Sequence, residues 1–328
     1  MTIAQTPCHR RLACLVLAAA AMAPLHQALS QTAYPTRPVK LINSFPPGGP
    51  SDILSRALAE VLQNTLKQAF IVENKPGAAG NIGADSVAKS APDGYTVLTG
   101  IDTTVTVNPH IYKGMPFKPS DLKTVMVMAS SGLLIGVNPG TGFKTLNDLI
   151  AAAKAKGVNF SSAGAGSPGH LAAALFTEAT GAKINHIPYK GNTPAVTAVL
   201  SGEVDGGVLA TPGMLPHVKA GKITALAVTS QRRSALAPEI PTVADAGLKS
   251  LEQEVLYVIM VPAATPDSVV QVLQRGIAEA LARPDMQARM TSLDMHFEGL
   301  TGAAAAKRLS DLSDGYARVI KSTGLKVE

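Results

Sequence analysis

Two glycine-rich loops carry the most informative chemistry in the sequence. Residues 45–52 read FPPGGPSD and residues 163–169 read AGAGSPG, and each loop follows an apolar run and precedes a helical pattern. Proline is accepted at the first position of a helix because its missing N–H would have no partner there, and glycine lets backbone amides approach a ligand closely. Free amides and the helix dipole favour an anion at such a helix start. Two such loops facing one cleft predict an anion clamp.

The second loop also contains the dinucleotide-binding pattern G-x-G-x-x-G, at Gly164, Gly166 and Gly169. That site requires an acidic residue for the ribose about 20 positions further on. Residues 186–192 read HIPYKGN and contain no carboxylate. A nicotinamide cofactor is therefore not predicted.

The same loop resembles the nucleophile elbow of a serine hydrolase, centred on Ser167 and followed by Asp205, His217 and His296. That hydrolase uses the N–H of the residue after the serine to bind the oxyanion, and here that residue is Pro168, which has none. Ser167 is better interpreted as a helix N-cap or as a hydroxyl donor to a ligand. An exported serine hydrolase built on Ser167 is kept as the enzyme alternative.

Candidates for metal or thiol chemistry are few. Both cysteines, Cys8 and Cys14, lie in an N-terminal segment predicted to be removed, so the mature chain has no thiolate and no disulfide. The later histidines are far apart in sequence and are interpreted as surface or capping residues: His110, His170, His186, His217 and His296. The sequence predicts no metal and no cofactor, and it indicates a binding site more clearly than a catalytic one.

The elements that must position the loops alternate between strand and helix, which predicts an α/β fold with a parallel sheet. The predicted strands are residues 39–44, 69–72, 95–99, 125–137, 158–162, 183–188, 204–209, 223–229 and 255–261, with a short strand at His296. The predicted helices are residues 53–66, 82–89, 145–155, 170–180, 193–201, 266–290 and 301–322. The stretch from residue 100 to 121 is predicted to be rich in turns.

Two apolar extended stretches, residues 133–137 and 255–261, bracket the second series of elements without a Gly/Ser or Pro linker. They predict two lobes joined by two crossing strands, with a ligand cleft between the lobes. Lobe 1 is expected to be discontinuous and to comprise residues 31–135 and 257–328. Lobe 2 is expected to comprise residues 136–256.

Composition and the N-terminus define the protein class. The 328 residues are 46% hydrophobic and 16% charged, which is ordinary for a globular protein. Arg10 and Arg11 precede an apolar run at residues 12–23, so residues 1–30 are predicted to be a secretory signal peptide. Its removal lowers the net charge from +6 to +4, with the charges scattered along the chain. There is neither a basic stripe nor aromatic interleaving, so no nucleic-acid partner is predicted.

Along essentially the whole mature length, the chain resembles the Bug receptors, which are the periplasmic solute-binding proteins of tripartite tricarboxylate transporters. The matching motifs are YPTRP (34–38), FPPGGPSD (45–52), VENKPGAAGNIG (72–83), APDGY (91–95), GSPGHL (166–171), HIPYKG (186–191), LPHVKAGK (215–222) and IPTV (240–243). Two positions depart from the family pattern. An acidic Asp-Asn pair is commonly found where this chain has Ala210-Thr211-Pro212, and a Trp is often found near Leu256-Tyr257.

The resemblance implies a two-lobed periplasmic binding protein fold of the type II-like class, each lobe being a sheet flanked by helices. Carried over by position, the first-lobe contacts would be Pro47, Gly48, Gly49, Ser51, Asp52, Thr103 and Thr104. The second-lobe contacts would be Ser162, Ala163, Gly164, Gly166, Ser167, His170, Lys190, Gly191, Thr193 and Thr211. Asp52 is interpreted mainly as a first-turn residue that complements the helix dipole.

The resemblance further implies a non-enzymatic, monomeric receptor in the periplasm. It would capture a small carboxylate-bearing ligand for the membrane subunits of a tripartite tricarboxylate-type transporter. A ligand sensor for a membrane signalling partner would use the same cleft and is the other alternative. Ser167 and Thr104, as small hydroxyl residues on opposite lobes, are predicted to bind the carboxylate when the lobes close.

Overall fold

The structure, a computed structural model, describes residues 34–325. The predicted signal peptide, residues 1–30, and its two cysteines lie outside the described residues. Within the described part, the residues from Arg37 onward form one compact unit. None of the helices in the described part has the length and apolar character that spanning a membrane requires.

The unit alternates strands and helices, as the sequence predicts. The strands are β1 (Val39–Asn43), β2 (Phe70–Asn74), β3 (Thr96–Ile101), β4 (Leu122–Val137), β5 (Val158–Ser162), β6 (Ile184–Pro188), β7 (Gly206–Ala210), β8 (Thr224–Val228), β9 (Glu254–Pro262) and β10 (His296–Leu300). The helices are α2 (Pro50–Leu66), α3 (Asn81–Ala88), α4 (Thr103–Thr106), α5 (Asn108–Ile111), α6 (Leu146–Lys156), α7 (Pro168–Thr180), α8 (Asn192–Ser201), α9 (Thr211–Lys219), α10 (Asp267–Ala282), α11 (Pro284–Ser292) and α12 (Gly302–Thr323).

The sheet is mixed, which corrects the expectation of a parallel sheet. The pairs β1–β2, β1–β3, β5–β6 and β5–β7 are parallel. Strand β9 runs antiparallel to β3 and β4, and β4 runs antiparallel to β7, β8 and β10. The physical reason is that the chain leaves the first group of strands along β4 and returns along β9. Two strands that cross in opposite senses must be antiparallel where they pair.

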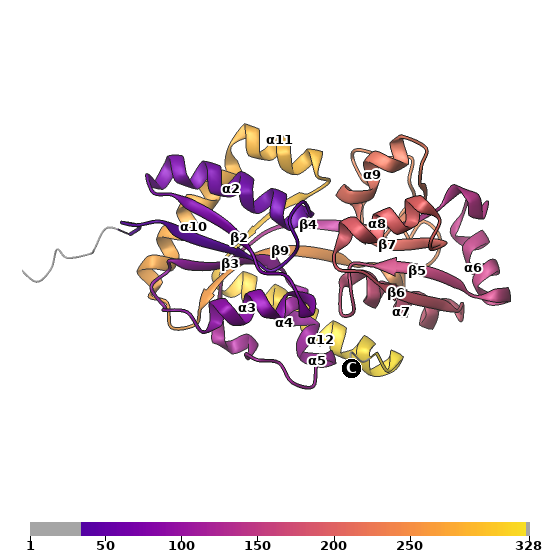
Figure 1. Cartoon of the computed structure of the whole chain (residues 1–328), viewed down its shortest axis with the longest axis horizontal. Helices are drawn as coiled ribbons and strands as arrows, with labels where there is room; N and C mark the ends of the chain where they lie inside the picture. Colours follow the sequence, from indigo (N-terminus) through magenta and orange to yellow (C-terminus); the bar gives the residue numbers. More distant parts are fainter. Residues whose placement is uncertain (1–33, 326–328) are drawn as a thin grey trace, which may run out of the picture. The chain divides into compact units, whose positions relative to one another are not determined.

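Strands β4 and β9 join the two groups of strands (Figure 1). Strand β4 pairs with β9 from Leu122 to Gly132, and from Leu133 onward it pairs with β7 and β8 instead. Its side chains are buried without interruption over residues 125–137. This continuous burial explains why the sequence reads as one long apolar run, because a strand covered on both faces has no polar alternation.

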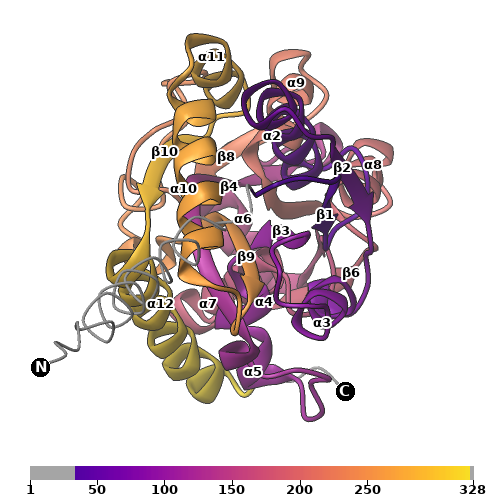
Figure 2. The same ribbon diagram turned by 90° about the vertical axis from the view of Figure 1, so that its left-hand side faces the viewer.

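Helices cover both faces of the first strand group. α2 packs on β1, β2 and β3 and contacts α10. On the opposite face, α3 and α12 enclose a core that includes Ile42, Leu98, Leu256 and Val258. Figure 1 shows α2 above these strands and α3 and α12 below them, and Figure 2 gives the view along the strands.

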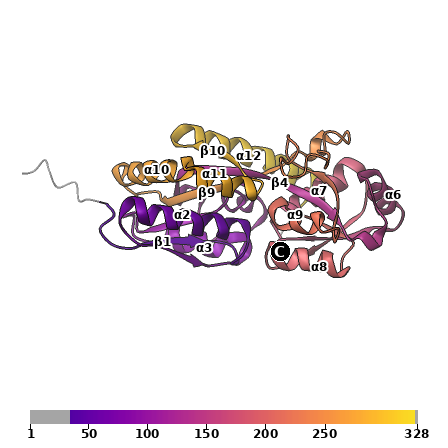
Figure 3. The ribbon, with the colours of Figure 1, turned by 90° about the horizontal axis from the view of Figure 1, so that it is seen from above.

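The second strand group is covered in the same way. α8 and α9 share an apolar core with β4, β7 and β8, built around Leu134, Val199 and Leu209. α7 packs against β5, β6 and β7, and the helices around this group can be followed in Figure 3. The α/β periplasmic binding protein fold expected from the sequence is therefore present.

Two helical predictions are corrected. The helix expected over residues 266–290 is two helices, α10 and α11, separated at Arg283. The cause is Pro284, because the residue before a proline is forced toward extended backbone, and Arg283 has a ψ of 141°. The stretch expected to be turn-rich between residues 100 and 121 contains the short helices α4 and α5.

Candidate functional site

The first glycine-rich loop joins β1 to α2 and is fixed by a charged network. Gly49 is the N-cap of α2 and Pro50 occupies its first turn, as the sequence predicts. The buried carboxylate of Asp52 accepts hydrogen bonds from the Gly48 N–H at 3.0 Å and from Asn74 Nδ2 at 2.8 Å. It also pairs with Arg56 Nε at 3.0 Å. Burial alone would raise the pKa of Asp52, but the hydrogen bonds from Arg56, Gly48 and Asn74 lower it below its ordinary value.

The second glycine-rich loop joins β5 to α7 and is fixed by neutral groups. Ser167 caps α7, and its Oγ accepts a hydrogen bond from the His170 N–H at 3.3 Å, which confirms the N-cap interpretation. The Gly166 N–H donates to His170 Nδ1 at 3.1 Å, and Ser162 Oγ is hydrogen-bonded to His186 Nε2 at 2.6 Å. Because its oxygen acts as the acceptor, the Ser167 hydroxyl still has its own proton to donate.

Two histidines beside this loop, His170 of α7 and His186 of β6, form a stacked pair. The His170 and His186 rings lie 3.8 Å apart between centroids, with 9° between their planes. Burial lowers the pKa of His170 to about 4. Burial, with a smaller contribution from the neighbouring His170, lowers the pKa of His186 to about 3. Both rings are therefore neutral at neutral pH, and the loop carries no charge of its own.

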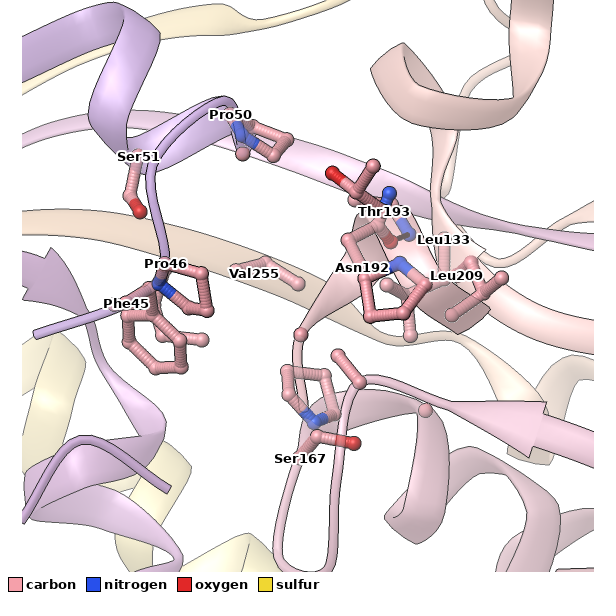
Figure 4. A pocket seen from close by; sticks show the side chains of 18 of the residues that line it. Phe45, Pro46, Pro50, Ser51, Leu133, Ser167, Asn192, Thr193, Leu209 and Val255 are labelled. Carbon is pink, nitrogen blue, oxygen red and sulfur yellow. Dashed lines mark hydrogen bonds between the residues drawn. The ribbon is translucent and has the colours of Figure 1, made fainter. Parts of the chain in front are cut away.

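A cavity of about 240 Å³ lies where the two loops meet. The starts of α2, α7 and α8 contribute part of its wall, and the strands β3, β4, β7 and β9 contribute the rest, as Figure 4 shows for ten labelled residues. Its lining residues are Phe45, Pro46, Pro47, Gly49, Pro50, Ser51, Ile101, Leu133, Ala163, Ser167, Pro168, Gly169, Gly191, Asn192, Thr193, Pro194, Val208, Leu209, Ala210, Val255 and Tyr257. No residue in this lining carries a charged side chain.

The start of α8 is held against the second loop. Gly191, its N-cap, donates its N–H to the Ala163 carbonyl at 3.1 Å. Asn192 Oδ1 accepts a hydrogen bond from the Ala210 N–H at 3.0 Å, which ties α8 to the end of β7. Pro50 and Pro168 have no N–H and the His170 N–H is taken by Ser167, so the first-turn amides that remain for a ligand include those of Ser51 in α2, Gly169 in α7 and Thr193 in α8. Such a cavity is suited to an anionic group that is held by dipoles and hydroxyls.

Seven of the residues carried over from the family lie in the wall of this cavity. They are Pro47, Gly49, Ser51, Ala163, Ser167, Gly191 and Thr193. Gly48 lines an adjoining cavity instead. Asp52, Ser162, Gly164, Gly166 and His170 belong to the networks that shape the two loops, and Lys190 is exposed beside Gly191.

The structure does not place Thr103, Thr104 or Thr211 in the cavity wall. The chain turns into α4 directly after β3, and this turn carries Thr103 and Thr104 into buried positions. Thr104 Oγ1 lies 3.5 Å from the Ala79 carbonyl, its hydrogen-bond acceptor. Thr211 Oγ1 donates to the Gly132 carbonyl at 3.0 Å. The Thr104 and Thr211 hydroxyls therefore join neighbouring elements, while Thr103 Oγ1 is buried without a hydrogen-bond partner within the described part of the chain.

Sequence reasoning missed the apolar part of the wall. Ile101, Leu133, Val208, Leu209 and Val255 come from four different strands. Each of them reads in the sequence as an ordinary core residue. A positional signal existed only for Ile101, Val208 and Leu209, which lie toward the carboxyl ends of β3 and β7, because side chains at the carboxyl ends of strands in parallel pairs face the ligand cleft in open α/β sheets. In the sequence the rule points instead to Thr103 and Thr104, which lie two and three residues beyond the end of β3.

A buried carboxylate lies beside the cavity without reaching it. Asp102 accepts a hydrogen bond from the Leu256 N–H at 2.9 Å and another from Thr106 Oγ1 at 3.1 Å. Burial raises the pKa of Asp102 to about 6, against the effect of these hydrogen bonds. The Asp102 N–H also donates to the Leu256 carbonyl at 2.9 Å. Asp102 therefore fastens the end of β3 to β9, next to Ile101.

Comparison with known proteins gives a consistent result. The model of the family described as "Tripartite tricarboxylate transporter family receptor" matches residues 54–325. Protein BugT from Bordetella pertussis is 35% identical over 309 residues, which covers 92% of this chain and 93% of that protein.

Solved structures resemble the chain over most of its length. An R. palustris protein solved with adipate has a TM-score of 0.86 and 29% identity, covering 89% of this chain and 99% of that one. The periplasmic binding protein BugD has a TM-score of 0.84 and 30% identity, covering 90% of this chain and 100% of that one.

Proposed function

Since the chain belongs to the receptor family of tripartite tricarboxylate transporters, we propose that it is a periplasmic receptor that captures a small carboxylate for a transporter of this type. The observation that carries the proposal is the uncharged cavity at the starts of α2, α7 and α8, with the hydroxyls of Ser51 and Ser167 in its wall. Amides and hydroxyls in such a place bind an anion without a counter-ion. The relative solved with adipate supports a carboxylate as the ligand class.

We infer that the receptor works by lobe closure. The proposed lobes are residues 31–135 with 257–328, and residues 136–256, joined by β4 and β9. The cavity takes Ser51 from the first proposed lobe and Ser167 from the second. A ligand that touches both has a higher affinity for the closed state, and this difference is what drives closure. The membrane subunits of the transporter would then recognise the closed form.

The local geometry at Ser167 supports a receptor over a hydrolase. Within the described part of the chain, the only hydrogen bond of Ser167 Oγ is the one from the His170 N–H, and His170 Nδ1 is occupied by the Gly166 N–H. No histidine is therefore placed to remove the Ser167 proton as a general base. Ser162 does contact His186, but Ser162 is fully buried and lies outside the cavity lining.

A thermal-shift screen of small acids, neutral sugars and amines tests the ligand class. An acid present at 100 times its Kd should stabilise the protein by about 2.7 kcal/mol. The bound acid should be recovered unchanged by chromatography. Stabilisation by sugars or amines but by no acid would contradict the carboxylate assignment, and turnover of the acid would contradict the receptor assignment.

The role of the cavity is tested with two hydroxyl variants. Ser167→Ala should weaken binding of the acid found in the screen by about 1–3 kcal/mol, because a buried partner loses its hydrogen bond. Thr104→Ala is the matched control, since Thr104 lies outside the cavity wall. Small-angle scattering should show compaction with ligand in the wild type. Equal losses in the two variants, or no compaction, would place the site or the hinge elsewhere.

The transporter assignment needs a cellular measurement. Uptake of the labelled acid should fall when the receptor gene is deleted and recover when it is restored. If uptake does not change while the expression of other genes does, the receptor serves a signalling partner.

A further inference from the structure

We infer that the ligand carries a single carboxylate on an apolar body, such as an aliphatic or aromatic monocarboxylate, and that di- and tricarboxylates are disfavoured. This inference rests on the proposed function and specifies the ligand for the same cavity. It follows from the distribution of hydrogen-bonding groups around the cavity wall.

The polar part of the wall is confined to the helix starts, where the side chains of Ser51, Ser167, Asn192 and Thr193 line the cavity and Asn192 Oδ1 already accepts the Ala210 N–H. The Ser51 side chain is only 6% exposed and forms no hydrogen bond within the described part of the chain, although it lines the cavity. Ser167 is 4% exposed and keeps a proton to donate. With the first-turn amides of Gly169 and Thr193, which also line the cavity, these hydroxyls supply four donors, and one carboxylate has about four lone-pair positions. A buried hydroxyl without a partner would gain most from such a ligand.

The strand part of the wall is apolar and offers no free donor. It consists of Ile101, Leu133, Val208, Leu209, Val255 and Tyr257. The Tyr257 hydroxyl is the one polar atom among these side chains, and it is already hydrogen-bonded to Ser131 Oγ at 3.1 Å. Figure 4 shows Leu133 and Leu209 on the side of the cavity away from Ser51, with Val255 between them and Pro46. Hydrocarbon is the chemistry that such a surface binds.

A second carboxylate would have no compensation on this surface. Among residues 34–325, no lysine, arginine or histidine lines the cavity, and Lys190, next to the lining residue Gly191, is exposed to solvent. A charge that loses its water must be paired or strongly hydrogen-bonded, and an apolar wall supplies neither. A monocarboxylate avoids this cost and buries its hydrocarbon instead. The wall therefore selects against the second charge while the helix starts select for the first.

The test compares acids that differ by one carboxylate. Hexanoate and adipate share a six-carbon chain, and benzoate and terephthalate share a ring; 1-hexanol removes the charge altogether. Titration calorimetry on the mature protein should show hexanoate or benzoate binding at least about tenfold more tightly than its dicarboxylate partner. If a dicarboxylate binds as tightly or more tightly, this inference is overturned and the proposed function stands. If no acid binds, or if only 1-hexanol does, both are overturned.

Two valine variants test whether the apolar wall contacts the hydrocarbon body of the ligand. Val255→Thr places a hydroxyl on the apolar wall with little change of shape, and it should weaken binding of the preferred monocarboxylate at least about threefold. Val258→Thr is the matched control, because Val258 lies on the same strand but faces the core under α3 and α12. Thermal unfolding of both variants separates binding from folding. Equal affinity in Val255→Thr and Val258→Thr would overturn the assignment of the apolar wall to the ligand body.

Discussion

The loops before α2 and α7 have the same plan but are fixed by different forces. Both follow a parallel strand, both place a proline in the first helical turn, and both contribute a serine to the cavity. The first is held by an ion pair and hydrogen bonds to Asp52. The second is held by a serine cap and a neutral histidine pair. The comparison teaches that the backbone shape of a helix start is what the two loops share, while the supporting chemistry is free to differ.

The loops also differ in the space around their glycines. A Cβ on Gly169 would lie 2.1 Å from the Val208 carbonyl oxygen, which is backbone and cannot move aside cheaply. A Cβ on Gly49 would lie 3.6 Å from the Pro46 carbonyl oxygen, an ordinary contact. The second loop is therefore packed directly on β7, while the first has room around it.

The largest expected effect on stability comes from a substitution that removes the close packing of the second loop on β7. Gly169→Ala should lower the free energy of unfolding by about 3 kcal/mol, because the methyl group forces α7 away from β7. Gly49→Ala is the matched control and should lower it by no more than about 1 kcal/mol, since the φ of −79° suits alanine although alanine is a poorer N-cap than glycine. Urea denaturation of both variants measures the difference. Equal unfolding free energies would mean that α7 does not depend on its contact with β7.

The next largest effect is the pH dependence of the unfolding free energy that arises from the histidine pair beside the second loop. The pKa values of His170 and His186, about 4 and about 3, lie below the ordinary 6.5, so the unfolded chain takes up protons that the folded chain refuses. Stability should therefore fall as the pH drops below 6.5, and the loss should be complete below the folded values. Allowing for the partial exposure of the rings, the loss between pH 6.5 and 4.5 should be about 2–3 kcal/mol.

Urea denaturation at a series of pH values measures this slope. His186→Gln keeps a hydrogen-bonding partner for Ser162 but removes one titrating ring, so it should flatten the slope. His296→Gln removes an exposed histidine outside the pair and serves as the control. If His296→Gln flattens the slope as much as His186→Gln does, the stacked pair is not the source of the acid sensitivity.

Much of the architecture was predictable because strong local signals agree with it. Pro50 and Pro168 mark the starts of α2 and α7, and the uninterrupted apolar run of β4 marks a central strand. The direction of β9 was not predictable in this way, because a continuous apolar run has the same sequence pattern whether the strand pairs parallel or antiparallel with its neighbours. Only its pairing with β3 and β4 makes the sheet mixed.

The candidate site was predictable where glycine, proline and serine shape a helix start, as at Gly49 and Ser167. It was not predictable where the wall is made of strand side chains such as Val255, because a residue that faces a cavity and a residue that faces a core have the same sequence pattern. Thr104 shows the opposite case. Its position after β3 is the right one for a cleft residue, but the turn into α4 directs it toward Ala79.

The smallest of the three expected effects concerns the charged support of the first loop. Asp52→Ala should lower the free energy of unfolding by about 1–2 kcal/mol at neutral pH, because it leaves the Gly48 N–H without its acceptor and removes one of the two acceptors of Asn74 Nδ2, the other being the Phe45 carbonyl. Asp311→Ala is the matched control: Asp311 also forms an i,i+4 ion pair, 2.6 Å from Lys307, but both side chains are exposed. Its loss should cost less than about 0.5 kcal/mol.

Since the pKa of Asp52 is lowered on folding, the stabilisation by Asp52 is present above the ordinary value of 3.8 and is lost as the pH falls through the folded value. The gap between wild type and Asp52→Ala should therefore persist at pH 5, where the histidine pair already weakens the second loop, and close only in stronger acid. If this difference in unfolding free energy disappears between pH 6.5 and 4.5, the stability of the first loop depends on the same titrating histidines as that of the second loop.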